Sequence, residues 1–191
     1  MYLLIPIFLS IVVALLRGKD LSRFALQDRF KAPWLVILAL VLRVLLYIPP
    51  ITEYALQLRI TPYLNPVPYF LMVLFVIVNL HLKLIRPALI LLGFGTLLNL
   101  VTVLANGGFM PTRLDMMIYT DTASPEIIAK LQQGIPDCHT ILMDESSRLT
   151  FLADNFPLPL PHPFAAVFSI GDAIIGIGAF WLFQSIFPPK R

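Results

Sequence analysis

The chain has 191 residues, of which 58% are hydrophobic and 13% charged, and its formal net charge is +3. Its mean hydropathy of +0.84 excludes the composition of an ordinary soluble domain. A net charge this small also gives no reason to expect a nucleic-acid partner. We therefore expect an integral membrane protein whose first partner is the lipid bilayer.

Five apolar runs follow one another along the chain and predict five transmembrane helices. They cover residues 2–16, 34–48, 66–85, 87–105 and 164–187. A bilayer core of about 30 Å needs roughly 20 helical residues, and tilt or flanking residues accommodate shorter runs. We expect an all-α membrane protein with one domain over residues 1–191. A loop of residues 106–163 is inserted between the fourth and fifth helices.

The basic residues predict how the chain is oriented. Five of them follow the first run, namely Arg17, Lys19, Arg23, Arg29 and Lys31. A cleaved secretory signal has basic residues before its apolar core, so we expect the first helix to be retained. Basic residues also mark the connection 81–86 and the residues Lys190 and Arg191. Because Lys and Arg in short loops stay in the cytoplasm, we predict an N-terminus outside and a cytoplasmic C-terminus.

The insertion of residues 106–163 is predicted to lie outside the cytoplasm, where it is the only part long enough to fold in water. Ser124 followed by Pro125 has the form of an N-cap and first helical residue, which predicts a short helix over 125–133. Two β-prone runs, 139–143 and 148–152, predict a hairpin with a four-residue connection. The prolines of residues 155–163 predict an extended arm.

The sequence lacks the motifs of nucleotide-binding and serine-hydrolase enzymes, because it contains no GxGxxG, Walker or GxSxG pattern. The histidines His81, His139 and His162 are scattered, and no metal-ligand spacing surrounds Cys138. We therefore predict no cofactor, no metal site and no catalytic residue. Cys138 is the single cysteine, and it is either a small semi-buried residue or a reactive or intermolecular thiol.

Polar residues inside apolar runs are costly to bury and point to function. At 1.5 Å per residue, Arg43, Asn99 and Asp172 fall at a similar depth near the outer ends of their helices. A charge-assisted pair of Arg43 and Asp172, completed by Asn99, would offset the cost of burial. With Asn106 these residues form the predicted polar cluster at the outer helix ends.

Two alternatives to this cluster stay open. The Arg43 side chain can extend past Tyr47 to the outer interface, where it needs no carboxylate partner. Ser169 and Asp172 also have the spacing of a capping box. In that case the last helix begins at Ile170, and Asp172 lies at the interface in its first turn.

Glycines mark the end of the fourth helix and the faces of the last two. Asn106, Gly107 and Gly108 can adopt the left-handed conformation that closes a helix, and Pro111 prevents its continuation. The two glycines could also leave N–H groups free to bind an anion. Four further glycines, Gly93, Gly95, Gly176 and Gly178, predict faces where helices approach closely.

Several short motifs occur in a fixed order. They are Asn99, then Asn106-Gly107-Gly108-Phe109-Met110-Pro111, then Leu152-Ala153-Asp154, then Phe168-Ser169-Ile170-Gly171-Asp172. Together they resemble a bacterial family of small multi-pass membrane proteins named domain of unknown function 5317. The resemblance covers nearly the whole chain and implies this architecture in a bacterial inner membrane, but no reaction. Phe109 replaces a residue that is usually polar or basic, and Ala153 replaces a common glycine.

Three functional classes fit these observations. The first, which we expect, is an accessory or structural subunit that assembles with a protein partner or a second copy through its helices and outer loop. The second is a component of a small-molecule or lipid transporter, which would need polar residues across the membrane. The third is a membrane enzyme that acts on lipid-linked substrates through Asp154 and Asp172 as acid and base.

Overall fold

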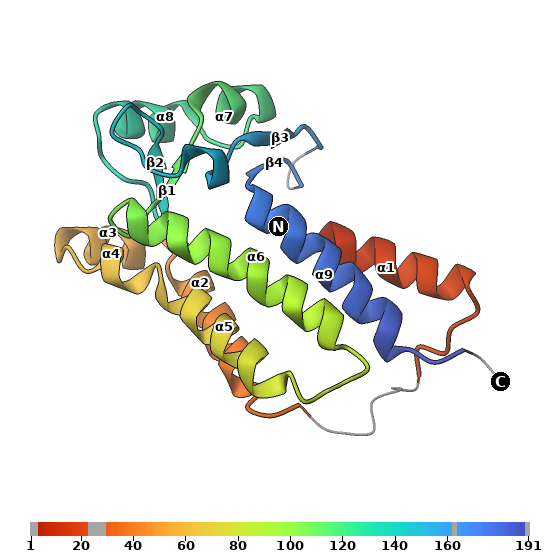
Figure 1. Cartoon of the computed structure of the whole chain (residues 1–191). Helices are drawn as coiled ribbons and strands as arrows, with labels where there is room; N and C mark the ends of the chain where they lie inside the picture. Colours follow the sequence, from red (N-terminus) through yellow and green to blue (C-terminus); the bar gives the residue numbers. More distant parts are fainter. Residues whose placement is uncertain (1–3, 23–29, 162–163, 190–191) are drawn as a thin grey trace.

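The computed structural model describes residues 4–22, 30–161 and 164–189. Some residues on which sequence expectations rest lie outside these ranges, namely Arg23, Arg29, His162, Lys190 and Arg191. The described residues form a layer of helices with a small mixed insertion at one end (Figure 1).

The apolar runs form the longest helices of the structure. These are α1 (Leu4–Leu16), α2 (Trp34–Leu45), α5 (Val67–Asn79), α6 (Arg86–Ala105) and α9 (Ile170–Ile186). α6 packs against α5 and α9, while α2 packs against α5 and α1 against α9. The helices therefore stand in the order α2, α5, α6, α9, α1, with α1 and α2 at the two ends (Figure 1).

Two helical segments of the described chain are long and apolar enough to cross a membrane, Thr61–Asn79 and Arg86–Ala105. A third candidate combines α2 with α3 (Pro49–Gln57), a pair that passes the same test jointly but bends by 84°. α1 and α9 are apolar but shorter. Length and composition thus give two or three candidate spans, and the five predicted spans are not confirmed.

Prolines explain why the helices around the second and third runs differ from the prediction. The expected loop between these runs contains α3 and the short α4 (Thr61–Leu64). Each carries proline at its first or second position, where a missing N–H costs no helical bond. The third helix ends at Asn79 and not at residue 85, and Pro87 stands in the first turn of the next helix, α6, where its missing N–H costs no helical bond.

The last helix begins later than its apolar run. Residues Ala166–Phe168 form strand β4, and α9 starts at Ile170. Ser169 Oγ accepts a hydrogen bond from the N–H of Asp172, and Asp172 Oδ2 accepts one from the N–H of Ser169. The alternative in which a capping box sets this helix start is therefore confirmed.

The insertion holds two helices and two small sheets. β1 (Met110–Thr112) pairs in parallel with β2 (Thr140–Leu142), and β3 (Phe156–Leu158) pairs antiparallel with β4. α7 (Leu114–Thr120) and α8 (Pro125–Gln132) lie between β1 and β2 in the sequence. The predicted helix over 125–133 is confirmed as α8, with the Ser124 side chain accepting a hydrogen bond at its start.

The predicted hairpin of residues 139–143 and 148–152 is wrong. β2 pairs with β1, and the second run forms a turn of 3-10 helix, η1 (Thr150–Leu152). The side chain of Asp144 accepts hydrogen bonds from Ser146 and Ser147, which folds the connection onto itself. Leu149 then takes a left-handed conformation with φ of 52°. The chain that follows β2 therefore turns away from β2, and β2 pairs with β1 instead.

Glycines set how closely α6 and α9 approach. A Cβ atom at Gly95 would overlap the carbonyl oxygen of Gly171, and one at Gly178 would stand 2.9 Å from the nitrogen of Leu92. The close approach expected at Gly95 and Gly178 is thus confirmed. It fixes the register in which the outer part of α6 faces the start of α9.

Basic residues gather at the end of the helices opposite the insertion. Lys19, just after α1, donates hydrogen bonds to the carbonyl oxygens of Gln184 and Phe187 at the end of α9. The N–H and carbonyl of Lys31 bond at 2.7 and 2.9 Å to the side chain of Asn79, which is fully buried at the end of α5. α1 and α9 therefore run in the same direction, away from the insertion.

Candidate functional site

One cavity of about 740 Å³ extends from the helices to the insertion. α1, α2, α5, α6 and α9 all contribute to its lining, as do β1, β2, β4 and the segment around Asp154. Its volume is typical of sites for small molecules, which measure roughly 300–1,000 Å³. Three members of the predicted polar cluster line it, namely Arg43, Asn99 and Asp172.

A closed set of hydrogen bonds joins the start of α9 to the middle of α6. Asn99 Nδ2 donates to Asp172 Oδ1 at 2.7 Å, and Ser169 Oγ donates to Asn99 Oδ1 at 2.8 Å. Asn99 and Ser169 are almost completely buried. Together with the capping box these bonds hold the Asp172 carboxylate in one orientation at the cavity wall.

Gly171 makes this arrangement possible. A Cβ atom at this position would overlap Asn99 Oδ1 and approach the carbonyl oxygen of Gly95. Three residues at the start of α9 thus have distinct physical roles, with Ser169 capping the helix, Gly171 admitting Asn99 and Asp172 completing the box.

Arg43 lies against two aromatic rings at the cavity. Its guanidinium carbon is 5.6 Å from the ring centroid of Tyr47 and 5.4 Å from that of Tyr69. Such contacts stabilise a cation where water is scarce. Arg43 therefore contacts Tyr47 and also lines the cavity with Asp172, while its predicted extension to the outer interface stays a prediction.

Asp154 enters the cavity from the insertion. Its N–H donates to the carbonyl of Pro111 at 3.1 Å, and its carbonyl accepts from the N–H of Arg113 at 3.2 Å, so the backbone continues the sheet beside β1. The side chain meets only a long bond of 3.4 Å from Thr112 Oγ1 to Oδ2. Oδ1 is buried and accepts no hydrogen bond from the described residues.

Burial favours the uncharged form of the Asp154 carboxyl. It raises the pKa of this carboxyl well above its ordinary value, and the nearby negative charge of Asp172 raises it further. The positive charge of Arg43 acts in the opposite direction. The cavity thus brings together two carboxyls in contrasting environments, one held by hydrogen bonds and one buried with an unused oxygen.

His139 is the second group with an unused polar atom in the cavity. Its Nε2 lies 3.2 Å from the hydroxyl of Tyr47, while its buried Nδ1 has no partner in the part of the chain that the structure describes. Burial, and then the positive charge of Arg43, lowers the pKa of His139 well below its usual range. The imidazole is therefore neutral at physiological pH.

The remaining predicted residues hold the insertion in place. Asn106 bonds to the carbonyl of Thr102 and to the backbone N–H and carbonyl of Arg148, so it lies apart from the other cluster residues. Gly107 and Gly108 have φ of 65° and 89° and close α6 as expected. Two further motif residues, Met110 and Pro111, are buried in β1.

Tyr69 and His139 are cavity residues that the sequence did not single out for this site. Tyr69 is one aromatic residue near the end of an apolar run, where tyrosine is common in membrane helices. His139 has no second histidine or cysteine at a ligand spacing. Neither residue carries a local signal, because each reaches the cavity through contacts between distant segments.

The cavity reaches the apolar surface of the helices between α1 and α2. Ile7 of α1 and Leu40 of α2 both line it, and Leu40 is 63% exposed. α1 and α2 stand at opposite ends of the helix layer, and their described residues do not pack together as the neighbouring helices do. Apolar side chains of both end helices therefore line the cavity together with its polar groups.

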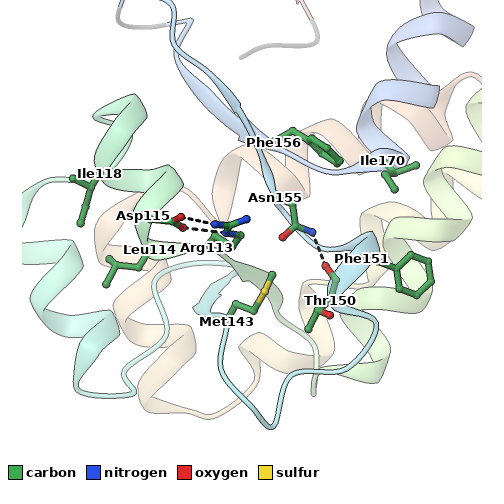
Figure 2. Close-up of a pocket in the computed structure, with 10 residues that line it drawn as sticks. All are labelled: Arg113, Leu114, Asp115, Ile118, Met143, Thr150, Phe151, Asn155, Phe156 and Ile170. Carbon is green, nitrogen blue, oxygen red and sulfur yellow. Dashed lines mark hydrogen bonds and ion pairs between the residues drawn. The ribbon is translucent and has the colours of Figure 1, made fainter.

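A second depression lies on the insertion beside the start of α9 (Figure 2). Figure 2 shows Arg113 and Asp115 turned toward each other in an ion pair, and Asn155 bonded to the carbonyl of Thr150. Arg113, Asp115 and Asn155 thus have hydrogen-bond partners here, in contrast to Asp154 Oδ1 and His139 Nδ1 of the cavity. In the described residues no three acidic, histidine or cysteine side chains are placed to hold a metal ion.

Comparison with protein families matches residues 27–184 to DUF5317, a family of unknown function. A search of curated proteins and a search of solved structures each give no match. The matched range contains every motif that carried the resemblance, from Asn99 to Asp172. The chain therefore belongs to the DUF5317 family of unknown function.

Proposed function

We propose that this chain is a multi-pass membrane protein that binds a small amphipathic molecule or lipid in the cavity, as the binding component of a transport system. The observation that carries this proposal is the make-up of the cavity. Asp154 and His139 present unused polar atoms at one end, and Ile7 of α1 and Leu40 of α2 add apolar side chains to its lining. An amphiphile entering from the bilayer would match both parts.

Basic residues support the orientation that we propose, with the insertion outside the cytoplasm of a bacterial inner membrane. Lys19, Lys31 and Arg86 lie at the end of the helices opposite the insertion. Since basic residues are retained in the cytoplasm, the cavity would open in the outer leaflet. The accessory-subunit role expected from the sequence stays a prediction, because no partner chain or second copy bears on it.

Native mass spectrometry of the purified protein tests the binding function. Met72 lines the cavity from α5, whereas Leu74 of the same helix is 46% exposed and lies outside the lining. We expect wild-type protein from membranes to retain an amphiphile, Met72→Trp to lose it by filling the cavity, and Leu74→Trp to keep it. Retention of the same molecules by Met72→Trp, with melting midpoints unchanged in all three proteins, would place binding elsewhere.

A membrane enzyme is the second candidate, favoured by the contrast between the two cavity carboxyls. Asp172 accepts two hydrogen bonds, whereas burial raises the pKa of Asp154. Acid and base pairs in active sites often show such a contrast. Incubation with a lipid extract, followed by mass spectrometry, should then reveal a product that Asp154→Asn abolishes. A lipid profile that wild-type protein leaves unchanged argues for binding alone.

A further inference from the structure

We propose that the cavity selects an amphiphile whose head group carries a protonated primary amine, and that Asp154 holds this amine. The inference rests on the proposed function, because it requires the cavity to be a ligand site. It adds the chemical class of the head group.

The charged side chains of the cavity favour a cationic head group. They are Arg43, Asp137, Asp154 and Asp172, so two carboxyls besides that of Asp154 face one cation. His139 adds no positive charge, since burial lowers its pKa. In a site of low dielectric an anionic head group would meet more repulsion than attraction, and a cation would meet the reverse.

Two of these charged groups already have well-placed partners. Asp172 accepts hydrogen bonds from Asn99 and from the N–H of Ser169. Arg43 lies over the rings of Tyr47 and Tyr69. A ligand would gain least by replacing these contacts. The candidates for ligand binding are therefore the other two carboxyls, those of Asp137 and Asp154.

Of the two remaining carboxyls in the described residues, Asp154 is the one whose unused oxygen is buried. Its Oδ1 is buried and receives no hydrogen bond from the described residues, and Oδ2 receives only the 3.4 Å bond from Thr112. A buried acceptor without a donor destabilises a structure, so a donor from the ligand would be favourable. An ammonium group supplies that donor and also the charge that lets the carboxyl ionise, which makes the bond stronger than one from a neutral hydroxyl.

The neighbours of Asp154 distinguish between kinds of cation. Aromatic faces recognise quaternary ammonium groups, but Arg43 lies over the rings of Tyr47 and Tyr69. A primary amine instead offers N–H donors, which the unused oxygen of Asp154 requires. Ile7, Val36 and Leu40 line the apolar part and would contact a hydrocarbon chain, so the cation is an organic amphiphile.

Four amphiphiles with the same chain and different head groups test the inference. They are dodecylammonium, dodecyltrimethylammonium, dodecanol and dodecyl phosphate. Their binding to purified full-length protein in maltoside micelles is measured by displacement of a fluorescent nitrobenzoxadiazole-dodecanol probe. We expect dodecylammonium to bind at least about tenfold more tightly than the other three, because only it brings both N–H donors and charge.

Substitutions test whether Asp154 causes the preference for dodecylammonium. Asp154→Asn should remove the advantage of dodecylammonium and leave dodecanol binding within about twofold of wild type. Glu145→Gln removes one exposed carboxyl from the same insertion and should keep the preference. Asp154→Ser serves as a second variant if the asparagine protein does not accumulate, and the melting midpoint of each variant verifies its folding.

The possible results distinguish a failure of the amine inference from a failure of the proposed binding function. Equal binding of dodecylammonium and dodecanol by wild-type protein, or a preference for dodecyl phosphate, overturns the amine inference and leaves the proposed function standing. A preference that survives in both Asp154 variants overturns the role of Asp154. Failure of all four amphiphiles to displace the probe overturns both proposals.

Discussion

At the scale of single residues, we expect the titration of Asp154 to make the free energy of unfolding depend on pH. Burial and the charge of Asp172 raise its pKa, with Arg43 opposing them. The folded state therefore binds a proton that the unfolded chain releases above pH about 4. Where the folded state binds more protons, the free energy of unfolding falls as pH rises. Stability from this group is thus lost between pH about 4 and the raised pKa.

Asp154→Asn should remove this loss, because an amide has no proton to release. As pH rises from about 4 to 8, the melting midpoint of wild-type protein in maltoside micelles should fall relative to that of the variant. His139 and Cys138 titrate in both proteins, so their contributions cancel in the comparison. Glu145→Gln serves as the control and should follow wild type. Parallel curves for all three proteins would contradict a buried, protonated Asp154.

Gly171→Ala should destabilise the junction of α6 and α9 by about 1–3 kcal/mol, because its Cβ overlaps the side chain of Asn99. Gly176→Ala is the matched control on the same helix, since its Cβ would make an ordinary contact of 3.5 Å with Pro6. The free energies of unfolding from SDS titration give the comparison. Equal effects of the two substitutions would show that Gly171 needs no space for Asn99.

At the scale of elements, Asn65 fastens the insertion to the helices. Its Nδ2 donates to the carbonyls of Gly108 and Cys138 at 2.9 and 3.3 Å, and Cys138 Sγ donates to the carbonyl of Leu46. Cys138 is 7% exposed, and burial raises its pKa to about 11. The rate at which this thiol reacts therefore measures how often the insertion separates from the helices.

Asn65→Ala should speed the reaction of Cys138 with a maleimide at pH 7.5, because the carbonyls of Gly108 and Cys138 lose the bonds that Asn65 donates. Wild-type protein should react slowly, since a buried thiol with a raised pKa holds little thiolate. Asn155→Ala removes a bond within the insertion and is the control. A wild-type rate equal to that of an unfolded sample would contradict the buried position of Cys138.

Local signals predicted the element ends that depend on neighbouring residues. Ser124 before Pro125 marked α8, and the spacing of Ser169 and Asp172 marked the start of α9. The pairing of β1 with β2 escaped prediction, because α7 and α8 separate the two strands in the sequence. Sequence periodicity does not reveal which distant strand provides the partner.

Part of the candidate site could be predicted, because polar side chains are costly to bury in a membrane and are therefore conspicuous in an apolar run. Arg43, Asn99 and Asp172 stood out as polar residues in apolar runs, and the cavity brings them together. Asn106 was predicted to join them, but its side chain bonds to the backbone of Arg148. A position along a helix does not by itself determine which way the side chain faces. Tyr69 could not be predicted as a cavity residue from its position in an apolar run.

At the scale of the whole molecule, Lys19, Lys31 and Arg86 lie at the end of the helices opposite the insertion, and this placement determines the proposed orientation. In a Cys138→Ser background, Ser146→Cys in the insertion should react with an impermeant thiol reagent in intact spheroplasts. Lys83→Cys, between α5 and α6, should react only after the membrane is opened. Both positions are exposed, so access and not burial decides the result. The reverse pattern would contradict the orientation.

The cavity between α1 and α2 is the feature on which the proposed function depends, and the chain contains methionines that can report its occupation. Met72, Met110 and Met117 line the cavity. Met116 is the immediate neighbour of Met117 outside the lining, and Met143 lines the second depression. Their methyl groups therefore distinguish binding in the cavity from binding elsewhere.

The most direct test is methyl NMR of methionine-labelled protein in deuterated micelles titrated with protonated dodecanol. The account predicts saturable shift changes and intermolecular nuclear Overhauser effects at Met72, Met110 and Met117, with Met116 and Met143 unaffected. Effects confined to Met143, or shifts that grow equally at every methyl without saturating, would contradict a ligand site in the cavity.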